Sequence, residues 1–297
     1  MSEPLGAANP ALLAQVPELP RPANADSLSI AITEWGDVGP MVLMVHGGVQ
    51  GGIGGGPTNF HAQRPLADRG WRLRLMDRPG FGDSPSRGPD DMEADAVIIA
   101  DHLGEGGHLI GHSFGGAGAL LAAARRPEAV RSLTLIEPAL QPLIFTDPQV
   151  AESEQGKKVG AVVAHFLMEA KTPAEFAMNF ARSMSRPGTD ANASLANITD
   201  SPEKAELLGH SLLRARGVSP VEMKAAADAV RQHGVPVLII SSGYNEGQEI
   251  TAAVVARATG GKHVVVPGDS HFIQRDTPDQ FNAVVDAFMR ESESRTR

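Results

Sequence analysis

The sequence predicts an α/β fold in which a mostly parallel sheet is flanked by helices. Short apolar runs alternate with helix-like segments along most of the chain, and several runs are continuous, as in strands buried on both faces. Strands that alternate with helices require right-handed crossovers and therefore favour a parallel sheet. The alternation is interrupted once, between about residues 140 and 218, where only helix-like segments occur.

The composition is that of a globular protein with a large core. The chain has 297 residues, of which 42% are hydrophobic and 21% are charged. Its net charge of −9 argues against nucleic-acid binding, which needs a basic face. There is no cysteine, so disulfides and thiolate metal sites are excluded. We expect neither a metal nor an organic cofactor.

Membrane association is not expected either. No apolar stretch approaches the ~20 residues that a membrane-spanning helix needs. The first residues lack the apolar core of a signal peptide. We therefore expect a cytoplasmic protein that has no membrane partner. Whether the helical region mediates a homodimer stays open.

The first elements follow an N-terminal arm, residues 1–26, which is rich in Ala and Pro and shows no periodicity. Leu28, Ile30 and Ile32 alternate with polar or small residues, which predicts a half-exposed strand near a sheet edge. Residues 41–45 are continuously apolar and predict a strand buried on both faces. The next expected elements are a helix near 58–69, a strand over 72–76, a helix over 91–103 and a strand over 108–110.

Small residues between Gly115 and Ala124 suit a helix packed tightly on the sheet. The later strands are expected over 130–136, 235–240 and 263–266, and the later helices over 249–259 and 278–290. Residues 140–220 contain helix-like segments at 159–170, 173–184 and 202–216. We interpret this region as a helical lid inserted into a core domain made of residues 27–139 and 221–297.

The pentapeptide Gly111-His112-Ser113-Phe114-Gly115 lies between an apolar strand and a small-residue helix, which is the setting of a nucleophile elbow. The backbone of the serine in such a turn is strained, and the two glycines leave room for the turn. The hydroxyl projects at the helix N-terminus, where free amides can stabilise an oxyanion. Ser113 is therefore the predicted nucleophile.

A serine hydroxyl needs a general base, and the chain has 10 histidines. His271 lies in Pro267-Gly268-Asp269-Ser270-His271-Phe272, just after the last predicted strand, at the edge where the active sites of parallel sheets gather. His46 begins the turn after the first buried strand and is interpreted as structural. His112 is the neighbour of Ser113 and cannot easily reach its hydroxyl. We predict that His271 is the base.

Four motifs follow one another along the chain: His46-Gly47-Gly48, Asp77-Arg78-Pro79-Gly80-Phe81-Gly82-Asp83-Ser84, Gly111-His112-Ser113-Phe114-Gly115-Gly116, and Gly268-x-x-His271. In this order they resemble the α/β-hydrolase superfamily, over about residues 27–290. The resemblance implies an α/β-hydrolase fold. It also implies that the amides of Gly48 and Phe114 form the oxyanion hole, and that the loop of Asp77 shapes a turn.

The acid that orients His271 has two main candidates, because the family's chain order is serine, then acid, then histidine. Glu246 stands in the loop after the strand over 235–240, where many members have an aspartate. Glu137 directly follows the preceding strand, from which other members take the acid. A glutamate at the end of a buried strand is costly unless it is paired, which favours Glu137. Asp269, or no acid at all, stays a further alternative.

The resemblance implies hydrolysis of a carboxylic ester or lactone through an acyl-enzyme, without a cofactor. We expect the partner to be a small apolar ester or lactone. Two alternatives use the same residues: hydrolysis of a carbon–carbon bond in a diketone-like substrate, and acyl transfer. Ser113 argues against the dehalogenases and epoxide hydrolases of this family, which use an aspartate at the elbow. A ligand-binding protein with little turnover is an alternative from another class.

Overall fold

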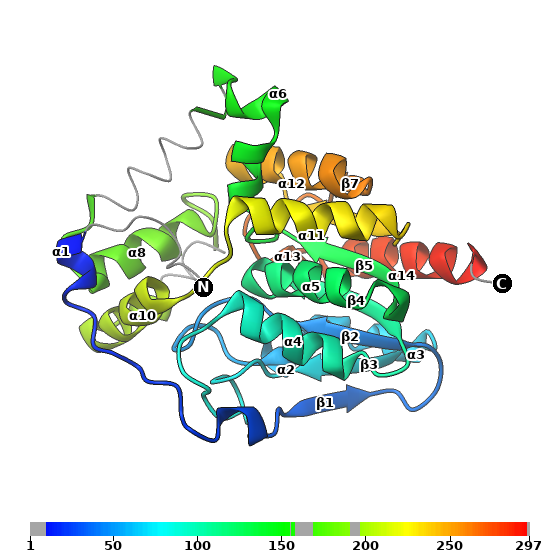
Figure 1. Ribbon diagram of the computed structural model, residues 1–297, viewed down its shortest axis with the longest axis horizontal. Helices are drawn as coiled ribbons and strands as arrows, with labels where there is room; N and C mark the ends of the chain where they lie inside the picture. Colours follow the sequence, from blue (N-terminus) through cyan, green and yellow to red (C-terminus); the bar gives the residue numbers. More distant parts are fainter. Residues whose placement is uncertain (1–9, 155, 158–168, 191–196, 296–297) are drawn as a thin grey trace.

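The computed structural model describes residues 10–154, 156–157, 169–190 and 197–295. They form a seven-stranded sheet in the order β1-β3-β2-β4-β5-β6-β7 (Figure 1). β1 is antiparallel to β3 and all other neighbours are parallel, which confirms the predicted sheet. The strands are β1 (Ile32–Trp35), β2 (Met41–Val45), β3 (Arg72–Met76), β4 (Gly107–His112), β5 (Val130–Ile136), β6 (Val237–Ser241) and β7 (Lys262–Val265).

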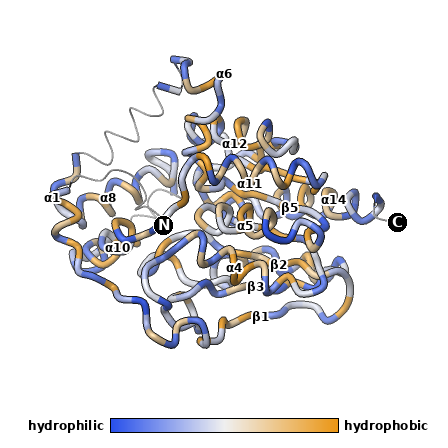
Figure 2. The backbone as a smooth tube through the Cα atoms, viewed as in Figure 1, coloured by the Kyte–Doolittle hydropathy of each residue, from blue (hydrophilic) through white to orange (hydrophobic). Residues whose placement is uncertain are grey.

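The sheet has an apolar core on each face, because successive side chains of a strand point to opposite sides. In β2, Leu43 and Val45 belong to one core, whereas Val42 and Met44 belong to the other. The first core also takes side chains from α4 (Met92–His102), α5 (Ser113–Arg125), α11 (Pro220–Gln232) and α12 (Glu246–Thr259). The second takes them from α13 (Ile273–Asp276) and α14 (Pro278–Arg295). The C-terminal end of α14 is hydrophilic (Figure 2).

The strand predicted from Leu28 onward begins only at Ile32. The reason is that the preceding backbone pairs with the loop after β3 and not with another strand. Ala31 N–H donates to Ser84 Oγ over 2.9 Å, and the Ala31 carbonyl accepts from Asp77 N–H over 3.0 Å. The alternation of apolar residues is real, but it does not distinguish a paired strand from an extended segment bound to a loop.

Between β5 and β6 the chain leaves the sheet and forms η4 (Gln141–Thr146), α6 (Pro148–Ala151), α8 (Pro173–Ser183), η5 (Asn197–Thr199) and α10 (Pro202–Arg214). Helices α8 and α10 pack against each other, away from the C-terminus (Figure 1). Helix α1 (Pro10–Leu13) lies near them, and the Gln15 side-chain amide donates to the Lys171 carbonyl over 3.2 Å. The helix predicted over 159–170 falls largely outside the described residues, and the lid stays a prediction.

Prolines set the boundaries of several helices. The helix predicted near 58–69 is divided into α2 (Gly56–Asn59), η2 (His61–Gln63) and α3 (Pro65–Asp68). Pro65 has no N–H with which to continue a preceding helix, so a new one starts there. Thr172, Ser201 and Ser219 cap α8, α10 and α11 with their side chains, and each is followed by a proline in the first turn. Within the described ranges, no helix is both long and apolar enough to cross a bilayer.

Asp77 organises the loop that follows β3. Its buried carboxylate accepts from Gly56 N–H over 2.7 Å and from Asp83 N–H over 3.0 Å, and its carbonyl accepts from the Ser84 hydroxyl over 2.6 Å. A Cβ at Gly82 would lie 2.1 Å from the Asp77 carboxylate, so a side chain has no room there. These contacts give Asp77 a structural role.

Replacing Asp77 by alanine should lower the free energy of unfolding by about 2–4 kcal/mol, because the buried amide of Gly56 and the partly buried amide of Asp83 lose their acceptor. Asp77→Asn keeps one carbonyl oxygen and should lose less. Urea denaturation monitored by tryptophan fluorescence measures both variants against the unchanged protein. A loss below about 0.5 kcal/mol for Asp77→Ala would contradict this role.

Candidate active site

Ser113 stands at the turn from β4 into α5, with a φ of 53°. This left-handed backbone is strained for a residue other than glycine. Two glycines make the turn sterically feasible. A Cβ at Gly111 would lie 2.6 Å from Ala119 Cβ, and one at Gly115 would lie 2.2 Å from the His46 carbonyl oxygen. The turn therefore leaves the Ser113 side chain partly exposed at the start of α5.

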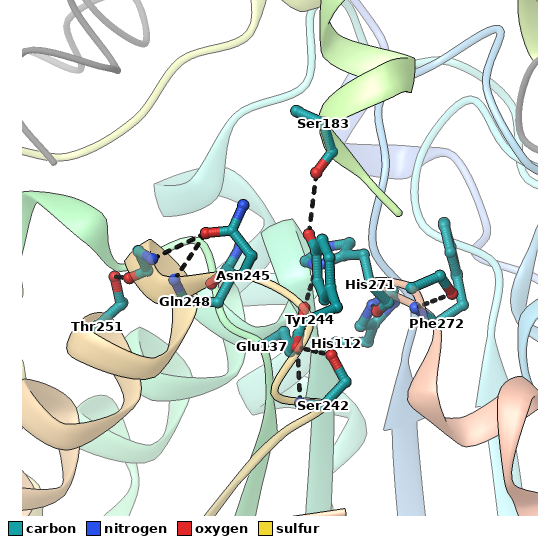
Figure 3. A network of polar contacts seen from close by, with 12 residues as sticks. His112, Glu137, Ser183, Ser242, Tyr244, Asn245, Gln248, Thr251, His271 and Phe272 are labelled. Atoms are coloured by element: carbon teal, nitrogen blue, oxygen red, sulfur yellow. Dashed lines mark hydrogen bonds and ion pairs between the residues drawn. The ribbon is translucent and has the colours of Figure 1, made fainter. Parts of the chain in front are cut away.

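Glu137, which directly follows β5, is paired with His271 from the loop after β7 (Figure 3). Glu137 Oε2 lies 2.7 Å from His271 Nδ1, and both side chains are almost fully buried. Ser242 donates to Glu137 Oε1 from its backbone N–H, over 2.9 Å, and from its hydroxyl. Glu137 shares the left-handed backbone of Ser113, with a φ of 38°. The surrounding hydrogen bonds must hold both residues in this conformation.

The pairing with Glu137 decides which nitrogen of His271 can act as a base. Because Nδ1 donates to the carboxylate, it carries the proton and Nε2 carries the lone pair. Nε2 is buried and has no hydrogen-bond partner in the described part of the chain. His271 and Ser113 line the same cavity, so a free basic nitrogen and a serine hydroxyl share one space.

The structure separates the other acid candidates from His271. Glu246 is the first residue of α12 and is exposed. Asp269 is exposed as well, and its carboxylate lies 3.1 Å from Arg186 Nε. Of the three acids considered from the sequence, Glu137 is the one whose carboxylate reaches the ring of His271.

The backbone of His271 is held from two sides. Its N–H donates to the Met184 carbonyl over 2.7 Å, and its carbonyl accepts from His112 Nε2 over 2.8 Å. Burial, together with the neighbouring His271, lowers the pKa of His112 well below its usual value. His112 therefore stays neutral and serves as an N–H donor. No sequence pattern indicated these contacts, because they join segments that are distant in the chain.

Tyr244, which sequence analysis also missed, lies between the Glu137–His271 pair and the end of α8 (Figure 3). Its hydroxyl donates to the Ser183 carbonyl over 3.1 Å. Burial and the negative charge of Glu137 raise the pKa of Tyr244, so the phenol keeps its proton. Tyr244 thus links the loop after β6 to the helices inserted between β5 and β6.

Gly48 and Phe114, the residues predicted to supply the oxyanion hole, lie beside Ser113, the predicted nucleophile. Gly48 has a φ of 81° and lines the cavity together with Ser113. Phe114 follows Ser113 in the first turn of α5, where backbone N–H groups have no partner within the helix. A Cβ at Gly47 would lie 2.6 Å from Ser113 Cβ, so the two segments approach closely.

Behind this segment lie the buried side chains of His46 and Arg78. His46 Nε2 accepts from Arg78 N–H over 3.1 Å, and His46 Nδ1 donates to the Gly47 carbonyl over 2.8 Å. Burial and the charge of Arg78 lower the pKa of His46 to about 3. The ring is therefore neutral, with both nitrogens engaged.

The cavity beside Ser113 is mostly apolar. Its apolar lining consists of Val49, Ile53, Phe180, Ala181, Met184, Ile198, Leu208 and Phe272. The polar side chains in the lining are Asn59, His112, Ser113 and His271. No Lys, Arg, Asp or Glu lines it within the described ranges, and no cluster of His, Asp and Glu that could bind a metal occurs in those ranges.

Comparison with known proteins identifies relatives of this chain. A family profile described as "Alpha/beta hydrolase family" matches residues 42–284. A pimeloyl-[acyl-carrier protein] methyl ester esterase from Neisseria meningitidis is 33% identical over 132 residues, which are 44% of this chain and 50% of the esterase. A 2-hydroxy-6-oxononadienedioate/2-hydroxy-6-oxononatrienedioate hydrolase from Comamonas testosteroni is 39% identical over 107 residues, 34% of this chain and 37% of that hydrolase. The chain thus spans half or less of these relatives' length.

Solved structures share the fold over nearly the whole chain. A thermophilic esterase from Thermogutta terrifontis has a TM-score of 0.63 and 21% identity, and the match covers 94% of this chain and 99% of the esterase. A 2-hydroxy-6-oxo-6-phenylhexa-2,4-dienoate hydrolase from Rhodococcus has a TM-score of 0.60 and 18% identity, covering 93% and 99%. At such low identity, these similarities concern the fold alone.

The lowered pKa of His46 has a consequence for stability. Between pH 6.5 and about 3 the unfolded chain binds a proton at His46 that the folded chain does not, so stability falls as the pH falls through this window. The loss from this group approaches about 1.4 kcal/mol per pH unit. Asp90, whose pKa burial raises to about 6, acts in the opposite direction between its unfolded value of 3.8 and about 6.

The contribution of His46 is therefore measured as a difference between two proteins. Urea denaturation of the unchanged protein and of His46→Gln, at intervals from pH 4 to pH 7, gives two stability curves. The variant has no titrating group at this position, so its curve should rise less steeply with pH. Parallel curves of unfolding free energy against pH would show that His46 is protonated to the same degree in the folded and the unfolded state.

Proposed function

The chain belongs to the alpha/beta hydrolase family, and on that basis we propose that it is a serine hydrolase that cleaves carboxylic esters or lactones. The observation that carries the proposal is the buried hydrogen bond between Glu137 and His271, at the cavity that Ser113 also lines. A histidine that is hydrogen-bonded to an acid and has its other nitrogen free can supply the base that acyl transfer to a serine requires. The similarity to an esterase of Neisseria meningitidis supports the ester as substrate.

In the proposed reaction, the Ser113 hydroxyl attacks the carbonyl carbon of the ester while His271 Nε2 takes its proton. Glu137 keeps the other proton on Nδ1 and stabilises the imidazolium that forms. The amides of Gly48 and Phe114 donate to the oxyanion. When the tetrahedral intermediate collapses, the alcohol leaves with the proton from His271. A water molecule, deprotonated by His271, then attacks the acyl-enzyme and releases the acid and free Ser113.

The lining of the cavity favours a substrate with an uncharged and apolar acyl group. Side chains from the segment after β2, such as Val49, and from the inserted helices, such as Phe180 and Leu208, line the cavity of Ser113 with apolar surface. Burial of apolar substrate surface against these groups would supply the binding energy. A charged acyl group would lose its hydration and, among the described lining residues, would meet no opposite charge.

Hydrolysis of a carbon–carbon bond is the second candidate, favoured by the similarity to the hydrolase of Comamonas testosteroni. The name of that enzyme's substrate is that of a dicarboxylate. A carboxylate is normally bound by arginine or lysine, and neither lines the cavity within the described ranges. Ester hydrolysis is therefore placed first.

The purified protein should react with a fluorophosphonate probe and should hydrolyse short apolar p-nitrophenyl esters. Ser113→Ala should abolish the labelling and lower turnover at least about 10³-fold, because the attacking oxygen is absent. The assay includes a long-chain ester, a lactone and a vinylogous 1,5-diketone. Cleavage of the diketone alone would assign the second function. Absence of both labelling and turnover would indicate a ligand-binding protein.

A pair of matched variants tests the acid. Glu137→Gln should lower kcat about 100-fold or more, because a neutral amide cannot stabilise the imidazolium and leaves His271 Nδ1 poorly oriented. Glu246→Gln should stay within about twofold of the unchanged protein, since this exposed side chain lies at the start of α12. The reverse result, a loss with Glu246→Gln alone, would assign the role to Glu246.

A further inference from the structure

We infer that His46 and Arg78 are positioning residues of the oxyanion hole, which fix the Gly47–Gly48 peptide so that Gly48 N–H points into the cavity. This inference rests on the proposed ester hydrolysis. Neither side chain lines the cavity. Both must therefore act through the backbone that they hold.

The Gly47–Gly48 peptide needs such support because neither of its residues has a side chain. It begins a glycine-rich segment, residues 47–56, and Gly48 has a φ of 81°. Backbone of this kind can adopt several orientations at little cost. An oxyanion donor lowers the barrier only when it is already oriented before the charge develops. The orientation must therefore be imposed by neighbouring groups.

His46 supplies the first restraint. Its Nδ1–H donates to the Gly47 carbonyl over 2.8 Å. In a trans peptide the C=O and the following N–H point in opposite directions. A Gly47 carbonyl held toward the buried ring therefore turns Gly48 N–H to the other side, toward the cavity. Arg78 N–H donates to His46 Nε2 over 3.1 Å, which fixes the tautomer with the proton on Nδ1.

Arg78 supplies the second restraint through its guanidinium. Nη1 lies 2.8 Å from the Gly48 carbonyl oxygen and 3.4 Å from that of Gly47. Nε donates to Asp95 over 2.6 Å, and Nη2 donates to Asp90 over 2.8 Å. The side chain is only 1% exposed, so water does not compete for these donors. A planar guanidinium with every nitrogen engaged cannot rotate, and both carbonyls are held by one rigid group.

The same arginine also contacts the second predicted oxyanion donor. Its guanidinium carbon lies 4.5 Å from the centroid of the Phe114 ring, a cation–π contact. Asp90 extends the network, because its second carboxylate oxygen accepts from Gln50 N–H over 2.9 Å. Arg78 thus binds the Gly48 carbonyl and contacts the Phe114 ring. It thereby fixes the two predicted oxyanion donors, Gly48 and Phe114, relative to each other.

Two substitutions of His46 separate its two hydrogen bonds. Asparagine places an amide nitrogen near the position of Nδ1, so His46→Asn can keep the donor to the Gly47 carbonyl but loses the acceptor for Arg78 N–H. Glutamine reaches the position of Nε2, so His46→Gln can keep that acceptor but loses the donor. We expect His46→Gln to have a kcat about tenfold or more below that of His46→Asn, with KM within about threefold.

The decisive readout is the ratio of kcat/KM for a p-nitrophenyl ester to kcat/KM for the matching thionoester. Sulfur accepts hydrogen bonds weakly, so the thionoester gains little from the oxyanion hole. Damage to Gly48 N–H should therefore lower the ratio, and His46→Gln should lower it more than His46→Asn. Arg78→Lys should lower it too, because an ammonium group cannot reproduce the fork that binds the carboxylates of Asp90 and Asp95 and the carbonyls of Gly47 and Gly48.

His108 provides the control. It is fully buried at the other end of β4, where Nδ1 pairs with the Ser132 hydroxyl over 2.7 Å. His108→Asn and His108→Gln should lower the unfolding temperature without changing the ester-to-thionoester ratio. All variants are assayed below their unfolding temperatures. If a His46 variant does not fold, Arg78→Lys tests the inference in its place.

The outcomes distinguish this inference from the proposed function. An unchanged protein that hydrolyses neither substrate overturns the proposed function and this inference together. Turnover by the unchanged protein, combined with unaltered ratios in His46→Gln and Arg78→Lys, overturns the positioning role alone. Equal ester-to-thionoester ratios for His46→Gln and His46→Asn would show that the hydrogen bond from His46 to the Gly47 carbonyl does not position Gly48 N–H.

Discussion

The Glu137 carboxylate is buried at the end of β5, so the segments around it must supply hydrogen-bond donors to both of its oxygens. A buried charge is stable only when its oxygens are met by donors. Here one oxygen binds His271 Nδ1 and the other binds two donors of Ser242. These partners are 134 and 105 residues away along the chain. They meet because β5, β6 and β7 are adjacent and parallel, so the loops after all three strands emerge at one edge of the sheet.

The strained backbones of Ser113 and Glu137 follow from the same arrangement. Both residues come directly after adjacent parallel strands, and both turn away from the sheet with positive φ. The Ser113 carbonyl accepts from Ala139 N–H over 2.9 Å, and Glu137 N–H donates to the Ile240 carbonyl over 2.9 Å. Each turn is therefore held by backbone from the neighbouring segment. The bond from Ala139 also ties the turn of Ser113 to the segment that follows Glu137.

Local patterns in the sequence predicted those features that depend on residues close together along the chain. Apolar runs located the strands, and the cost of burying a carboxylate favoured Glu137 over Glu246. In the structure, Glu137 is the carboxylate that lies 2.7 Å from His271 Nδ1. The start of β1 was predicted wrongly at Leu28, because apolar alternation does not reveal whether the backbone pairs with a strand or a loop. Tyr244 gave no signal, since its role depends on a carbonyl 61 residues away in sequence.

The position of His271, the proposed base, depends on the inserted helices as well as on the sheet. Residues just after α8 run antiparallel to the loop of His271, with a bridge between Ser185 and Ser270. The Met184 carbonyl holds His271 N–H, and the Ser183 carbonyl holds the Tyr244 hydroxyl. Met184 also lines the cavity. The segment that lines the cavity therefore also carries the backbone acceptor of His271, so a change in the end of α8 alters the cavity wall and the orientation of His271 together.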